Sequence, residues 1–76
     1  MTALTPKQER LLSLFKTAIE SEREAQEGYR RLLSINNDPA ITPIIEEIIG
    51  EEMRHEEKLI KMYNDLRGTQ EFKNQV

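Results

Sequence analysis

The sequence contains no cysteine and no tryptophan, and its aromatic residues are two tyrosines and two phenylalanines. The lack of cysteine excludes disulfide bonds, and 76 residues are close to the length at which one chain struggles to bury enough apolar surface. A bound metal ion, self-association or both must then supply the stability that a large core would give. We therefore expect a single domain, residues 1–76, that depends on a metal or on a second copy.

No apolar run is long enough to cross a membrane, and Met1–Pro6 has neither the basic cluster nor the apolar stretch of a secretion signal. The net charge is -3, and lysine and arginine are mixed among glutamates instead of forming a basic patch. Such a charge distribution is atypical of nucleic-acid-binding proteins. We expect a cytoplasmic protein with no membrane or nucleic-acid partner.

Proline and glycine are also scarce, with three of each. The prolines and Gly68 lie at the ends of two predicted long helices, whereas Gly28 and Gly50 lie inside them. Thr5-Pro6-Lys7-Gln8 has the residues of a capping box, with proline at the first helical position. The cluster Ser34–Pro39 is the only helix breaker in the middle, and it is short enough to turn the chain back. We predict an all-α, two-helix antiparallel hairpin with helices at about 6–35 and about 39–67, a loose first turn over 39–43, and a polar tail at 68–76.

Apolar residues recur in steps of four and three along both predicted helices, as they do in heptad repeats. This heptad stripe contains Leu11, Phe15, Ala18, Ala25, Tyr29 and Leu32 in the first helix, and Ile41, Ile45, Ile48, Leu59, Met62 and Leu66 in the second. Its gaps are filled by three polar residues, Glu22, Glu52 and His55. Because a buried carboxylate without a partner costs roughly several kcal/mol, these residues require a compensating group.

Two features of the spacing bring these three polar residues together. Glu52 and His55 are three residues apart and therefore share one helix face. Glu22 precedes Asn37 in the turn by as many residues as Glu52 follows it, so an antiparallel hairpin would place both glutamates at the same height. We predict that Glu22, Glu52 and His55 hold a metal ion.

A single hairpin offers only two carboxylates and one imidazole for this purpose. Two hairpins offer four glutamates and two histidines, the ligand set of di-iron four-helix bundles. We therefore expect a homodimer, or a larger ring-shaped homo-oligomer, with two iron ions per dimer interface, although such ligands also accept zinc or manganese. A second contact surface is expected at the apolar residues outside the heptad stripe: Leu12, Ile19, Ile44, Ile49, Ile60 and Tyr63.

The segment Glu22-Arg23-Glu24-Ala25, followed by Tyr29, and the segment Glu51-Glu52-Met53-Arg54-His55 resemble motifs of the ferritin-like di-iron carboxylate superfamily. The resemblance covers nearly the whole chain and is strongest to rubrerythrin-type domains and encapsulated ferritins, the latter being single hairpins that complete a four-helix bundle between subunits. It implies that the three polar residues of the heptad stripe are iron ligands and that Tyr29 is a catalytic residue beside them. It leaves open packaging inside an encapsulin-type protein shell.

The sequence thus favours a ferroxidase-like oxidoreductase that oxidises Fe(II) with dioxygen or peroxide at a di-iron centre between two subunits. The cysteine-ligated electron-transfer iron of rubrerythrins is excluded because cysteine is lacking. Two alternatives stay open. The hairpin could be a non-enzymatic dimeric adaptor whose buried polar residues fix the helix register, or it could bind zinc or manganese without catalysing a reaction.

Overall fold

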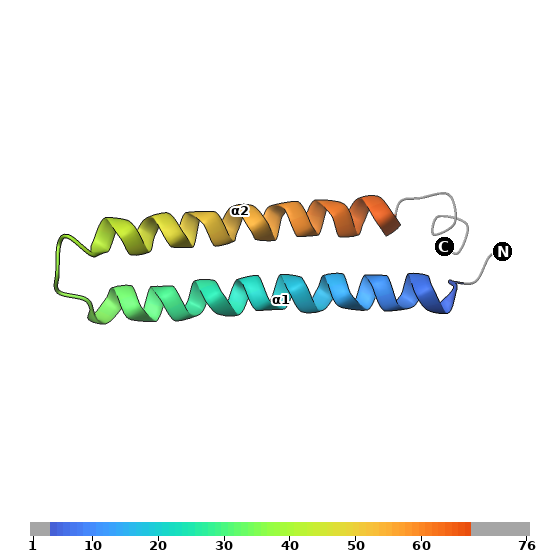
Figure 1. Ribbon diagram of the computed structural model, residues 1–76, viewed down its shortest axis with the longest axis horizontal. Coiled ribbons are helices and arrows are strands. Elements are labelled where there is room, and N and C mark those ends of the chain that lie inside the picture. The colour runs from blue at the N-terminus through green and yellow to red at the C-terminus, as the bar shows by residue number, and fades with distance from the viewer. Residues whose placement is uncertain (1–3, 68–76) are drawn as a thin grey trace.

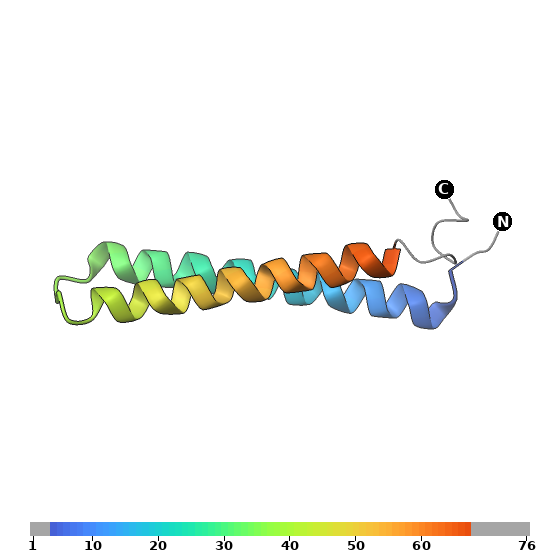
Figure 2. The same cartoon turned by 90° about the horizontal axis from the view of Figure 1, so that it is seen from above.

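The computed structural model describes residues 4–67, which form two long α-helices joined by a short turn (Figure 1). Helix α1 spans Pro6–Ile35, helix α2 spans Thr42–Arg67, and the two run antiparallel. The view from above shows that they cross each other (Figure 2). The prediction of an all-α, two-helix antiparallel hairpin is confirmed.

The start of α1 is fixed by the capping box that the sequence predicts. The Thr5 hydroxyl accepts a hydrogen bond from the Gln8 backbone N–H at 3.1 Å, and the Gln8 side-chain oxygen accepts one from the Thr5 N–H at 2.8 Å. Pro6 occupies the first helical position, where its missing N–H leaves no hydrogen bond unmade. These contacts satisfy two of the N–H groups that a helix start leaves without intrahelical partners.

Side chains of the turn replace the backbone hydrogen bonds that the helices lack there. The Asn36 amide donates to the Asp38 carbonyl at 3.0 Å and to the Thr42 hydroxyl at 3.1 Å. The Asp38 carboxylate accepts from the Ala40 N–H at 2.9 Å. Helix α2 begins at Thr42, after the non-helical residues 39–41. The polar tail expected at 68–76 lies outside the described residues.

The contact between the two helices is small and is centred on three isoleucines. Ile19, Ile45 and Ile49 are the buried apolar residues of the described chain, with 8%, 3% and 9% of their surface exposed. The radius of gyration is 17.2 Å, whereas a compact domain of this length has about 11 Å. The hairpin is therefore a rod with a thin apolar interface.

The residues expected to form a second contact surface lie partly inside the hairpin. Ile19 and Ile49, placed outside the heptad stripe, are buried within the hairpin, and Leu12, Ile60 and Tyr63 are half-buried. By contrast, four members of the heptad stripe are exposed: Leu11, Leu32, Ile41 and Met62. The reason is that apolar residues cover more of each helix than one contact can bury, and the two helices meet along one edge of that surface.

The exposed members of the heptad stripe form what we call the open apolar face (Leu11, Leu32, Ile41 and Met62). Two of its hollows lie at the end far from the turn, and their lining residues include Leu11, Phe15, Leu59 and Met62. Helices in globular proteins bury their apolar faces against another element. Within residues 4–67, neither helix has an apolar stretch that could span a lipid bilayer.

Candidate metal centre

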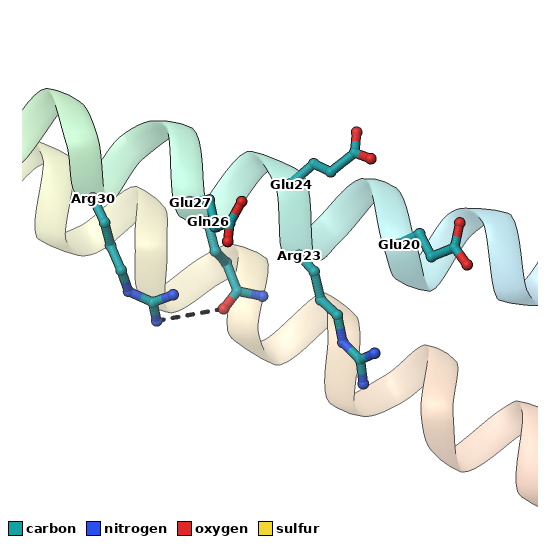
Figure 3. A pocket seen from close by; sticks show the side chains of 6 residues that line it. All are labelled: Glu20, Arg23, Glu24, Gln26, Glu27 and Arg30. Carbon is teal, nitrogen blue, oxygen red and sulfur yellow. Dashed lines mark hydrogen bonds between the residues drawn. The ribbon is translucent and has the colours of Figure 1, made fainter.

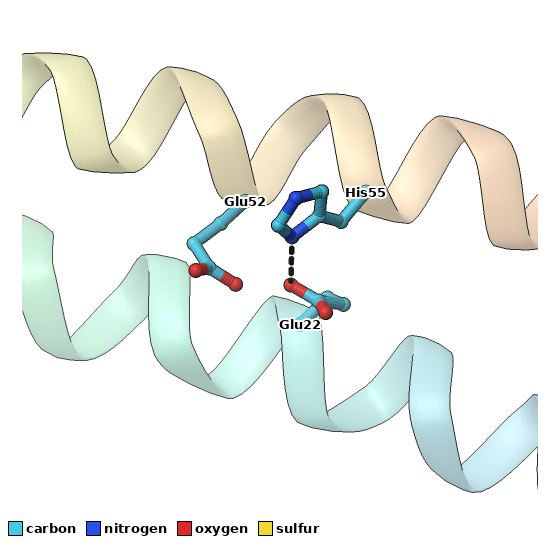
Figure 4. A group of neighbouring side chains, drawn as sticks. All are labelled: Glu22, Glu52 and His55. Atoms are coloured by element: carbon cyan, nitrogen blue, oxygen red, sulfur yellow. Dashed lines mark ion pairs between the residues drawn. The ribbon is translucent and has the colours of Figure 1, made fainter.

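The structure brings Glu22, Glu52 and His55 together at mid-height of the hairpin. Glu22 extends from α1, and Glu52 and His55 extend from adjacent turns of α2 toward it (Figure 4). Each of the three offers one ligand atom, and these atoms all lie within 4.8 Å of one another. The spacing argument made from the sequence thus gives the right neighbours.

Among residues 4–67, one oxygen of Glu22 has no hydrogen-bond partner. This Oε2 atom is buried, and His55 Nδ1 lies 3.7 Å from it, a distance too long for a hydrogen bond. Leaving a buried carboxylate oxygen unpaired is costly. A metal ion bound by this oxygen, Glu52 and His55 would supply the missing positive charge, so the residues present fit a divalent metal.

The pKa of Glu52 also favours a bound cation at this position. Its pKa is raised above the ordinary value, first by hydrogen bonding with the Glu22 carboxyl, then by burial and by repulsion from the Glu22 charge; His55 partly opposes the shift. Two carboxyls that compete in this way favour a shared cation. When no metal is bound, the Glu22 carboxyl therefore favours the protonated form of Glu52.

The group lies at the edge of the hairpin and is not enclosed by it. The His55 side chain is 54% exposed, and that of Glu22 is 22% exposed. Both residues belong to the heptad stripe, much of which lies on the open apolar face. One copy of the chain therefore covers one side of the candidate centre and leaves the other side to solvent.

The fourth predicted site residue, Tyr29, is half-buried on α1, seven residues after Glu22. Among the described residues, no hydrogen bond joins its hydroxyl to Glu22, Glu52 or His55. The catalytic role assigned to Tyr29 stays a prediction.

Sequence reasoning missed a polar network next to the metal group, which we call the Glu56 network (Arg23, Gln26, Arg30 and Glu56). Arg23 Nε donates to Glu56 Oε2 at 2.9 Å, and Gln26 Nε2 donates to Glu56 Oε1 at 2.6 Å. Gln26 is only 5% exposed, and Arg30 Nη2 donates to its Oε1 at 3.5 Å. Figure 3 shows Arg23 and Arg30 on either side of Gln26.

The hydrogen bond from Arg23, and then that from Gln26, lower the pKa of the Glu56 carboxyl, which favours its ionised form. A signal for the network was present, because Gln26 falls in a seven-residue repeat with Leu12, Ile19 and Leu33. A polar residue at such a position requires a partner across the contact.

A comparison with protein families supports the interpretation of these three residues as a candidate metal centre. The family model described as rubrerythrin matches residues 13–76, which include the three grouped residues. A comparison with curated proteins and one with solved structures each found no match. Since the family model spans most of the chain, the chain belongs to the rubrerythrin family, within the ferritin-like di-iron superfamily.

Proposed function

We propose that this protein is a ferroxidase-type oxidoreductase that oxidises Fe(II) at a di-iron centre formed between two copies of the hairpin. The observation that supports it most directly is the buried Glu22 Oε2, without a hydrogen bond, inside a Glu-Glu-His group of converging ligand atoms. Membership of the rubrerythrin family favours iron as the metal. Zinc and manganese are the competing metals for the same ligands.

The need for a second copy follows from the ligand count and from the open apolar face. One hairpin provides two carboxylates and one imidazole, whereas a di-iron bundle uses four carboxylates and two imidazoles. The exposed His55 and the apolar residues beside it lie where a partner would cover them. A two-fold axis along the open face would give each metal pair ligands from both chains and bury both faces.

The residues of the chain have separable roles in this proposal. Glu22 reaches across from α1, while Glu52 and His55 hold the ion from α2. Glu52 binds the metal in its ionised form, and its raised pKa means that protons compete with the metal for this carboxyl. Bound iron supplies the redox chemistry, in which two Fe(II) ions become Fe(III) and the electrons pass to dioxygen or peroxide. Tyr29 is proposed to tune the site without being a ligand.

Stopped-flow absorbance of Fe(II) oxidation tests the proposal. The wild-type protein should oxidise Fe(II) much faster than buffer alone. Glu52→Ala and His55→Ala should each reduce the rate to that of buffer, because symmetry removes two ligands per dimer. Glu20→Ala, which changes an exposed acid on α1, should behave as wild type. Wild-type oxidation no faster than buffer would contradict the proposal.

The same variants separate the enzyme from a dimeric adaptor. In an adaptor, Glu52→Ala and His55→Ala change the oligomeric state and no variant shows iron oxidation. Size-exclusion chromatography of each variant, run beside the kinetic measurements, detects a change in oligomeric state. Metal analysis of protein purified with iron, zinc and manganese all present identifies the preferred ion.

A further inference from the structure

The Glu56 network lies beside the candidate metal centre, along the same contact between the helices. Arg23 directly follows Glu22, and Glu56 directly follows His55. Gln26 follows Glu22 by four residues, and Glu56 follows Glu52 by four residues, so the members of these two pairs lie on nearly the same helix face. The two helices therefore share two neighbouring polar connections, the metal group and the Glu56 network.

The geometry of the Glu56 network is directional. The two oxygens of Glu56 accept from two different residues of α1, Arg23 at 2.9 Å and Gln26 at 2.6 Å. These donors are three residues apart, so one carboxylate connects to two successive turns. A slip of α2 by one residue moves Glu56 by about 1.5 Å and rotates it by about 100°, which would break both bonds.

The other contacts at this level fix the register less well. The apolar contacts of Ile19 and Ile49 are not directional, and the turn lies more than ten residues away along each helix, which is roughly 15 Å or more. Within the metal group itself, His55 Nδ1 lies 3.7 Å from Glu22 Oε2, which is too far for a hydrogen bond that would fix the register. The two hydrogen bonds of Glu56, by contrast, are short and directional.

We propose that Glu56, with Arg23 and Gln26, is a positioning element that sets the register of α1 against α2 and so holds Glu22 at metal-binding distance from Glu52 and His55. The inference rests on the proposed metal site. It assigns these residues a role in metal affinity, although none of them belongs to the ligand group. Their contribution is to preorganise the site, and it is separable from their contribution to stability.

The double variant Gln26→Leu/Glu56→Leu tests this role with Co(II) as the probe. Replacing a buried polar pair by apolar residues of similar size is often neutral or stabilising, so unfolding of the metal-free variant should require as much denaturant as wild type or more. Its Co(II) affinity should nevertheless fall by about tenfold or more, a loss typical of residues that orient metal ligands. The visible Co(II) absorption band should change in intensity, since it reports ligand geometry.

The control variant is Lys61→Ala, which breaks the Lys61–Asp65 ion pair. That pair has the same 2.9 Å distance as Arg23–Glu56, but both of its residues lie on α2 and are exposed. Its Co(II) affinity should equal that of wild type. If circular dichroism shows that the double variant is unfolded, Glu56→Gln takes its place, because it keeps the size of the side chain and removes the ionic contact with Arg23.

Two results would overturn the inference. One is a folded variant that binds Co(II) as tightly as wild type with the same absorption band. The other is a loss of affinity matched by an equal loss of stability, which would show a structural role alone. Failure of the wild-type protein to bind Co(II) at all would instead refute the metal site, so the two failures are distinguishable.

Discussion

At the scale of single residues, the interaction between Glu22 and Glu52 affects how the stability of the metal-free protein depends on pH. The raised pKa of Glu52 means that the folded state holds this proton more tightly than the unfolded state does. The associated stability is fully present below the ordinary pKa of 4.5 and is lost as the pH rises through the raised value. Metal-free protein should therefore lose stability on this account as the pH rises above 4.5 and through the raised pKa of Glu52.

Glu22→Ala should flatten this part of the pH profile, because it removes the first cause of the shift. The metal-free variant should also be more stable than metal-free wild type at pH 7, since one buried acid is gone. Denaturant unfolding at a series of pH values measures both effects. A wild-type profile that is flat above pH 4.5, or unchanged by Glu22→Ala, would count against the coupling.

The lowered pKa of Glu56 affects the stability of the protein in a different pH range. Its stabilising contribution is present above pH 4.5 and is lost as the pH falls through the lowered value. The two windows lie on opposite sides of the ordinary glutamate pKa and can be read separately from one profile. The profile below pH 4.5 thus reports on the Glu56 network, and the profile above pH 4.5 reports on the candidate metal centre.

At the scale of helices, the capping box at the start of α1 gives a quantitative expectation. Thr5→Ala removes the acceptor for the Gln8 N–H and should lower the free energy of unfolding by about 1 kcal/mol. A matched control is Thr17→Ala, because the Thr17 hydroxyl only donates back to the Ser13 carbonyl within α1. The control should leave stability unchanged or raise it, as alanine is the better helix former. Equal losses in both variants, measured by denaturant unfolding, would contradict the capping argument.

The helices also show what the sequence could and could not predict. The cap at Thr5 and the turn after Ser34 depend on neighbouring residues, so local rules predict them. Glu22, Glu52 and His55 were found because helix spacing and distance from the turn both point to them. The contact face was not predictable, because apolar residues cover much of each helix and only the paired structure selects an edge. Gln26 and Glu56 were missed for the same reason.

At the scale of the whole molecule, the proposed second copy would cover both the open apolar face and the exposed side of the candidate centre. The hairpin alone buries three apolar residues within its described part, and it leaves Leu11, Met62 and other large apolar side chains exposed. In the proposed dimer, association and metal binding would be coupled, because each would complete the other's site. Adding a metal should therefore strengthen the dimer, and removing it with a chelator should weaken it.

The central claim is that two chains share one di-iron centre, and native mass spectrometry with anaerobic Fe(II) tests it most directly. Each peak gives the number of chains and the number of bound ions at once. We predict a dimer, or a multiple of it, with two iron ions per pair of chains, and a loss of bound iron in His55→Ala. A wild-type protein that binds iron as a stable monomer, or a dimer that binds no iron, would contradict the account.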